Sequence, residues 1–156
     1  MSKALKTAAT HASVCIVISS FIVAMARLLK SDYLTKFFES NLILLLVALL
    51  AINTTTISVI MTKLRELSND PGVFGRTRSE LRVSIIEQLC LIALSALVLI
   101  GSKSQPISAN IPHAAFVSDV LLLAIFCYAV YILYDTAESV FVIIGFEETT
   151  GKDQDA

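Results

Sequence analysis

The sequence predicts an all-α integral membrane protein in which a bundle of four helices crosses the lipid bilayer. Composition is the first observation: 56% of the residues are hydrophobic and 16% are charged, whereas soluble domains carry about 25% charged residues. Length is the second. Residues 42–62 contain no charged side chain, and at about 1.5 Å per residue a helix of this length crosses the roughly 30 Å hydrocarbon layer. We expect one domain, residues 1–156, that holds four such spans.

The first predicted span covers residues 9–29, an apolar stretch that follows a polar start with Lys3 and Lys6. A basic start, a short apolar run and the small residues around Ala24 and Ala26 also resemble a secretory signal peptide with its cleavage site. We interpret the stretch as a span, with cleavage as the alternative.

The second predicted span, residues 42–62, follows a short segment that is expected to lie in the membrane interface. In residues 31–40 the apolar side chains fall on one face of a short helix, a pattern favoured at head-group level. The span itself carries Asn53 and Thr56 near its middle. Amide and hydroxyl groups at this depth usually need a partner on another helix, so we expect Asn53 to make an interhelical hydrogen bond.

The third and fourth predicted spans cover residues 83–101 and 115–134. A T-x-x-E capping box at residues 77–80 indicates where the third helix begins. The last apolar run continues past residue 134, and about 30 residues exceed one crossing, so we expect the helix to extend to about residue 146.

The distribution of basic residues predicts that both termini are cytoplasmic. Four spans place eight basic residues on the side of the termini: Lys3, Lys6, Lys63, Arg65, Arg76, Arg78, Arg82 and Lys152. The opposite side holds four: Arg27, Lys30, Lys36 and Lys103. Cytoplasmic loops carry the excess of lysine and arginine. We therefore expect a multi-pass protein of the cell inner membrane.

Polar side chains inside the spans are the candidate site residues. On a helical wheel, the third span carries a polar stripe along its length that includes Ser84, Glu87, Gln88 and Ser95. Asp135 and Glu138 lie on one side of the fourth helix, at the depth expected for Glu87. The stripe is either a hydrogen-bonding seam between helices or the lining of a polar path. The three acids either pair with arginines of the basic loop or bind a cation or a proton.

Motifs for catalysis, cofactors and nucleic-acid binding are missing from the sequence. His11 and His113 are isolated, the three cysteines lie far apart in apolar runs, and no phosphate-binding or nucleophile motif occurs. We expect no enzyme activity, no cofactor, no metal site and no nucleic-acid partner. The basic side chains between spans two and three are expected to contact lipid head groups or a cytosolic partner protein: Lys63, Arg65, Arg76, Arg78 and Arg82.

The sequence combines four spans, a charged loop between spans two and three, and the runs AINTTTISVIMTKLREL (51–67), EQLCLI (87–92) and YILYDT (131–136). This layout resembles small four-span bacterial inner-membrane proteins of the phage-defence or abortive-infection type, such as the Kiwa and Rex membrane components. The resemblance implies a homo-oligomer that senses a membrane event or depolarises the cell. The sequence thus favours a self-associating, non-enzymatic membrane effector that permits ion flow, with an anchor that recruits a cytosolic partner as the alternative.

Overall fold

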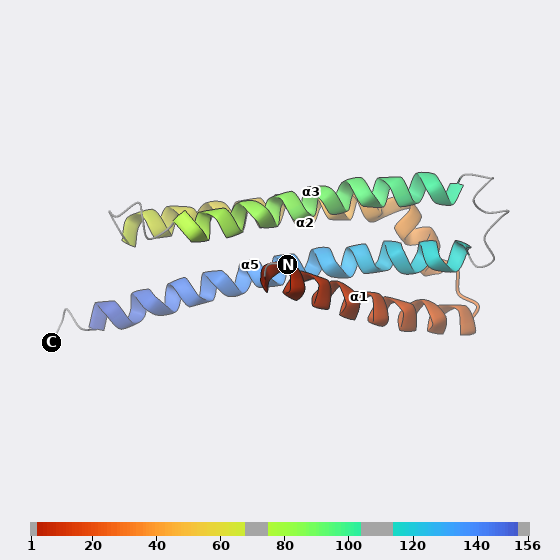
Figure 1. Ribbon diagram of the computed structural model, residues 1–156, viewed down its shortest axis with the longest axis horizontal. Helices are drawn as coiled ribbons and strands as arrows, with labels where there is room; N and C mark the ends of the chain where they lie inside the picture. Colours follow the sequence, from red (N-terminus) through yellow and green to blue (C-terminus); the bar gives the residue numbers. More distant parts are fainter. Residues whose placement is uncertain (1–2, 68–74, 104–113, 153–156) are drawn as a thin grey trace.

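The computed structural model describes the backbone of residues 3–67, 75–103 and 114–152, and the side chains of residues 9–63, 79, 81–102 and 114–139. These residues form an all-α four-helix bundle (Figure 1). Its helices are α1 (Lys3–Leu28), α2 (Tyr33–Leu67), α3 (Gly75–Lys103) and α5 (Ala114–Lys152).

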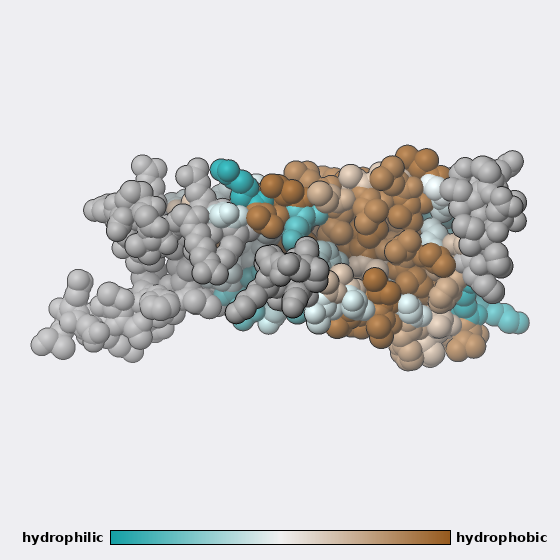
Figure 2. Space-filling model, viewed as in Figure 1, coloured by the Kyte–Doolittle hydropathy of each residue, from teal (hydrophilic) through white to brown (hydrophobic). Residues whose placement is uncertain are grey.

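Each of the four helices contains a stretch that is long and apolar enough to cross a membrane. The stretches are Ala9–Leu28, Tyr33–Lys63, Leu81–Ser102 and Ala114–Ser139. Large apolar side chains on their outer faces are exposed, and Figure 2 shows them gathered over the part of the bundle that includes α1. An apolar surface of this extent suits a lipid environment, because soluble proteins rarely expose large contiguous apolar patches. The chain is a multi-pass membrane protein.

The short helix predicted over residues 31–40 is not separate from the second span. Residues 33–40 form the first turns of α2, which runs without interruption from Tyr33 to Leu67. The first turns of α2 cross the end of the bundle at a steep angle to the rest of the helix (Figure 1). The earlier start also moves Asn53 away from the middle of its span, because Tyr33–Lys63 is apolar over a much longer length than residues 42–62.

Helix α5 is the element on which the other three helices pack, since it contacts α1, α2 and α3. The main core lies mostly between α2 and α5, with Val23 as the contribution of α1. Its buried side chains are Val23, Phe38, Leu42, Leu46, Val120, Leu122, Leu123, Ile125 and Ala129. Helix α3 covers this core with partly buried side chains such as Leu91 and Val98. Helix α1 packs chiefly against α5.

Helices α2, α3 and α5 are much longer than a bilayer crossing requires. Helices α2, α3 and α5 contain 35, 29 and 39 residues, which correspond to about 52, 44 and 58 Å at 1.5 Å per residue. The hydrocarbon layer is only about 30 Å thick. These helices extend past the N-terminal end of α1, all in the same direction (Figure 1). The helical extension expected to about residue 146 reaches Lys152.

Candidate functional sites at the two ends of the spans

A polar cluster joins α2, α3 and α5 near the end of the spans where α1 begins. Asn53 of α2 is fully buried, and its Nδ2 donates hydrogen bonds to Gln88 Oε1 at 2.9 Å and to Ser84 Oγ at 3.1 Å. Gln88 is only 2% exposed. The structure thus brings together three of the predicted site residues from two helices.

Thr136 of α5 completes this polar cluster, which we define as Asn53, Ser84, Gln88 and Thr136. The hydroxyl groups of Ser84 and Thr136 are 3.5 Å apart, and Thr136 Oγ1 donates to the carbonyl oxygen of Ile132 at 3.0 Å. Because the Thr136 proton is used in this way, Ser84 is the donor in the contact between the two hydroxyls. Thr136 is buried and was not singled out from the sequence, although it lies in the D-T-A-E run that interrupts the apolar stretch.

Two atoms of the polar cluster keep unused hydrogen-bonding capacity. Asn53 Oδ1, an acceptor, and Gln88 Nε2, a donor, are buried and have no hydrogen-bond partner among the described residues. An unpaired buried polar atom costs about 1 to 3 kcal/mol. The polar cluster is therefore stabilised only in part by its own contacts.

The remaining predicted hydroxyl groups bond within their own helices. Ser95 is fully buried and donates to the carbonyl oxygen of Ile92 at 2.8 Å, and Thr56 donates to that of Ile52 at 3.0 Å. Thr54 and Thr55 do the same with carbonyls four residues earlier. In α2 the need for an interhelical partner therefore concerns Asn53, because each of these threonine hydroxyls is satisfied by its own helix.

The three predicted acids lie near the polar cluster but do not converge on one point. Glu87 is half-buried, whereas Asp135 and Glu138 are exposed. Within the described ranges, no three acidic, histidine or cysteine side chains gather closely enough to hold a metal ion. Arg82 is exposed, and none of the three acids forms an ion pair with a described basic side chain.

The predicted basic contact residues are described only in part. Lys63 is half-buried near the end of α2, and its side chain is not free of interactions. The side chains of Arg65, Arg76 and Arg78 lie outside the described residues.

An aromatic stack holds the start of α1 against α5 at this same end. The ring of His11 stacks on Tyr131, with 4.3 Å between the ring centroids, and Tyr131 stacks on Tyr128 at 6.2 Å. His11, which is isolated in the sequence, thus contributes to the packing of α1 on α5.

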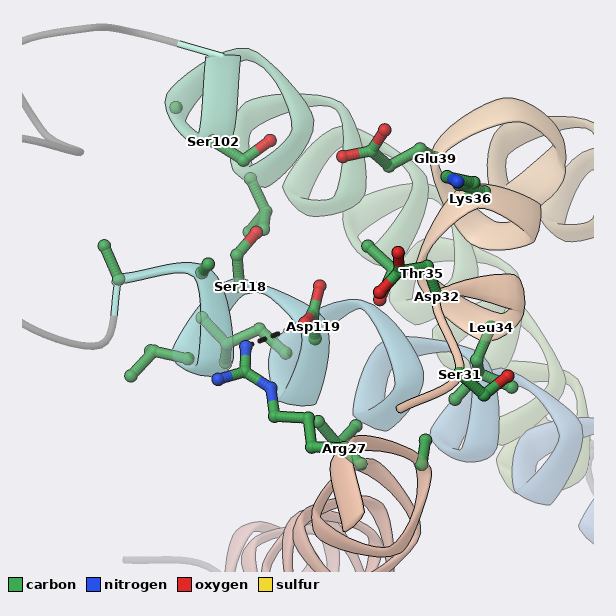
Figure 3. Close-up of a pocket in the computed structure, with 18 of the residues that line it drawn as sticks. Arg27, Ser31, Asp32, Leu34, Thr35, Lys36, Glu39, Ser102, Ser118 and Asp119 are labelled. Carbon is green, nitrogen blue, oxygen red and sulfur yellow. Dashed lines mark hydrogen bonds and ion pairs between the residues drawn. The ribbon is translucent and has the colours of Figure 1, made fainter. Parts of the chain in front are cut away.

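A charged cavity of about 700 Å³ lies at the opposite end of the spans (Figure 3). It is an open cavity lined by the end of α1, the first turns of α2, the end of α3 and the start of α5. Of the residues whose side chains are described, six charged ones line the cavity: Arg27, Lys30, Asp32, Lys36, Glu39 and Asp119. From the sequence, Arg27, Lys30 and Lys36 were expected only as basic residues on the side opposite the termini, and the cavity was not predicted. A usable signal was present, since Asp119 is an acid inside an apolar run, and such residues are functional candidates.

An ion pair crosses the charged cavity and joins α1 to α5. Arg27 Nη2 donates to Asp119 Oδ2 at 3.1 Å, and the Arg27 guanidinium lies 4.9 Å from the centroid of the Phe116 ring. The Asp119 side chain is only 15% exposed, whereas that of Arg27 is 45% exposed. Asp119 therefore depends on Arg27 for its charge balance more than Arg27 depends on Asp119.

In comparisons with known proteins, no family model, no curated protein and no solved structure matches the chain. The four apolar helices still identify a multi-pass membrane protein.

Lys30 adopts a backbone conformation that glycine usually adopts. Its φ is 53°, and it follows α1 in a Schellman motif: Ser31 N–H donates to the Ala26 carbonyl, and Lys30 N–H to the Arg27 carbonyl, both at 3.0 Å. The left-handed region costs a residue with a Cβ atom about 1 to 2 kcal/mol. The residue with this strained backbone, Lys30, is one of those that line the charged cavity.

Replacing Lys30 by glycine is expected to raise the free energy of unfolding by about 1 kcal/mol, because glycine adopts positive φ without steric cost. Thermal unfolding of the purified variant in detergent measures this effect. A variant less stable than the parent protein would show that the Lys30 side chain stabilises the fold.

Proposed function

We propose that this multi-pass membrane protein is a non-enzymatic effector that self-associates in a bacterial inner membrane, with both termini cytoplasmic, and lets ions cross it. The main support is that polar side chains enter the bundle from both ends of the spans. The polar cluster lies at one end and the charged cavity at the other. Rings of polar and charged groups at both mouths, separated by an apolar constriction, are the elements of a gated ion path.

A single copy of the bundle is closed in the arrangement observed. Between the two ends lies the apolar core built around Leu42, Leu46 and Leu122. The buried polar side chains at this depth, Ser19 and Ser95, bond to Cys127 Sγ at 3.9 Å and to Ile92 O at 2.8 Å. Ion flow therefore needs a second arrangement of the helices or a path between copies.

The exposed faces of α1 and α2 offer contacts between copies. Ala51 and Thr55 lie one turn apart on α2 and are both exposed, and Ala24 is exposed on α1. Small residues at this spacing let helices approach closely in a membrane. This arrangement supports self-association.

The absence of enzyme activity is part of the proposal. The hydroxyl groups of the polar cluster contact amides, each other and a backbone carbonyl, and no histidine or carboxylate activates them among the described contacts. A role in defence against phage rests on the resemblance in layout to the Kiwa and Rex membrane components. That resemblance covers the arrangement of spans and no individual site residue.

The extended helices favour a second candidate function, an anchor that recruits a cytosolic partner. Helices α2, α3 and α5 exceed the thickness of the hydrocarbon layer and project together beyond the start of α1. Their ends could present a docking surface without any ion path through the membrane.

Ion flux into liposomes tests the effector proposal. The purified protein is expected to dissipate a potassium gradient, and the double variant Glu87→Gln, Asp135→Asn is expected to reduce the flux to background, because these carboxylates would attract cations to the mouth of the path. Thr62→Val is the matched control, since Thr62 is exposed and bonds to its own helix at the same end.

Full flux in the double variant would show that the acids are structural. No flux from the parent protein, together with an unchanged membrane potential in cells that express it, would favour the anchor.

A further inference from the structure

The charged cavity lies where lipid head groups would meet the bundle. The membrane spans that surround it end at Leu28 and Ser102 or begin at Tyr33 and Ala114. Its lining combines the six charged side chains with apolar ones, among them Val23, Val98, Val117 and Leu121. A volume of about 700 Å³ falls in the range of ligand pockets, roughly 300 to 1,000 Å³. The site is thus of a size and composition to hold an amphiphilic molecule.

The charges around the charged cavity balance. Among the described residues that line it, three are basic and three are acidic, so a ligand with a single net charge would leave these groups unbalanced. A ligand with one anionic and one cationic group can pair its anionic group with a basic side chain of the cavity and its cationic group with an acidic one.

Several groups in the charged cavity have hydrogen-bonding capacity to spare. The bond to Asp119 uses one of the five N–H groups of the Arg27 guanidinium. Ser118 Oγ is buried and has no partner among the described residues, although other serines of the bundle bond to their own helix. Figure 3 shows Arg27, Ser118 and Asp119 around the same space.

Lys30 supplies a second cation at the cost of backbone strain. Its positive φ of 53° is disfavoured for a lysine, and residues are held in such conformations where the surrounding structure or a function requires them. Arg27 and Lys30 both line the charged cavity, and they supply a planar guanidinium and an ammonium, the two groups that usually bind phosphate.

We propose that the charged cavity binds the head group of a phospholipid with a primary ammonium group, phosphoethanolamine, with its phosphate at Arg27 and Lys30 and its ammonium at Asp119 and Ser118. A primary ammonium donates hydrogen bonds to the carboxylate and to Ser118 Oγ, whereas the quaternary ammonium of choline has no N–H to donate. The apolar part of the lining receives the start of the acyl chains. This inference does not depend on ion permeation.

Native mass spectrometry of the full chain in detergent tests the proposal. Phosphatidylethanolamine, phosphatidylcholine and phosphatidylglycerol with identical acyl chains are added in turn, and one phosphatidylethanolamine per chain is expected to be retained roughly tenfold better than either of the others. Lys30→Gly is expected to weaken retention of phosphatidylethanolamine by a similar factor, because a phosphate contact is lost. The thermal unfolding of Lys30→Gly checks that the variant is folded, so that weaker retention of phosphatidylethanolamine does not reflect unfolding.

Ser118→Ala separates the two head-group contacts. It is expected to lower the preference for phosphatidylethanolamine over phosphatidylcholine, since it removes an acceptor for the ammonium. Glu138→Gln, at the other end of the bundle, is the control and should retain the parent preference. Equal retention of the three lipids, or undiminished retention by Lys30→Gly, would overturn the proposal. Displacement of the lipid by an equal concentration of soluble glycerophosphoethanolamine would overturn the lipid as the occupant.

Discussion

Replacing Asn53 by leucine is expected to destabilise the bundle by about 2 kcal/mol, since interhelical hydrogen bonds in membranes contribute about 0.6 to 2 kcal/mol each. Asn53 is fully buried and donates two such bonds, to Gln88 and Ser84 of α3. The substitution also leaves Gln88 Oε1 without its donor in a buried site, which adds a desolvation cost. Reversible unfolding in mixed micelles measures the change.

Thr54→Val is the matched control for Asn53→Leu. Thr54 is the next residue along α2, its side chain is exposed, and its hydroxyl donates to the Leu50 carbonyl at 2.8 Å. We expect a change within about 0.5 kcal/mol, as for most surface substitutions. If Asn53→Leu were as stable as Thr54→Val, the hydrogen bonds of the polar cluster would contribute nothing to the fold.

Replacing Asp119 by leucine is expected to destabilise the packing of α1 on α5 by about 1 to 3 kcal/mol, because it removes one partner of a partly buried charge pair. Arg27 and Asp119 connect the two helices at 3.1 Å, and α1 packs chiefly against α5. In a background with Cys90→Ser and Cys127→Ser, which leaves Cys15 as the one thiol of the chain, alkylation of the buried Cys15 reports how often α1 leaves α5. The rate of Cys15 labelling is expected to rise in Asp119→Leu.

Asp32→Asn is the control for Asp119→Leu, because Asp32 lines the same cavity but is exposed. A double-mutant cycle of Arg27→Gln and Asp119→Asn should give a coupling energy of about 1 kcal/mol, the upper end for a pair with one exposed partner. Unchanged labelling in Asp119→Leu would show that the ion pair does not hold α1 in place.

The helices could be predicted from the sequence because the bilayer fixes a minimum length for an apolar span. All four predicted stretches fall almost entirely within the observed helices. The start of α2 was harder to predict, because the apolar side chains of residues 31–40 fall on one face of a short helix, which indicated an interfacial segment. In the structure α2 begins at Tyr33, and its charged residues Lys36 and Glu39 line the charged cavity at the end of the span.

The partners of the polar side chains could be predicted only in part. Periodicity placed Ser84 and Gln88 on one face of α3, and an amide in a span required a partner. The sequence could not predict which helix supplies that partner, nor that α5 is the helix on which the other three pack. Both depend on how four helices pack, and local pattern does not encode that packing.

The charged cavity could not be predicted because its lining comes from four separate segments. Asp119 alone was detectable as a lone acid in an apolar run, and its pairing with Arg27 joins residues 92 positions apart. The unusual backbone of Lys30 has no signature in the sequence, since glycine is the residue expected at that position.

Dual-reporter fusions test the central claim, four crossings of the inner membrane with both termini cytoplasmic. A phosphatase that is active only outside the cytoplasm and a fluorescent protein that folds inside it are fused after residues 31, 72 and 108 and at the C-terminus. The account predicts outside, inside, outside and inside, in that order. Fusions after residue 72 and at the C-terminus on opposite sides, or two successive fusion sites on the same side, would contradict it.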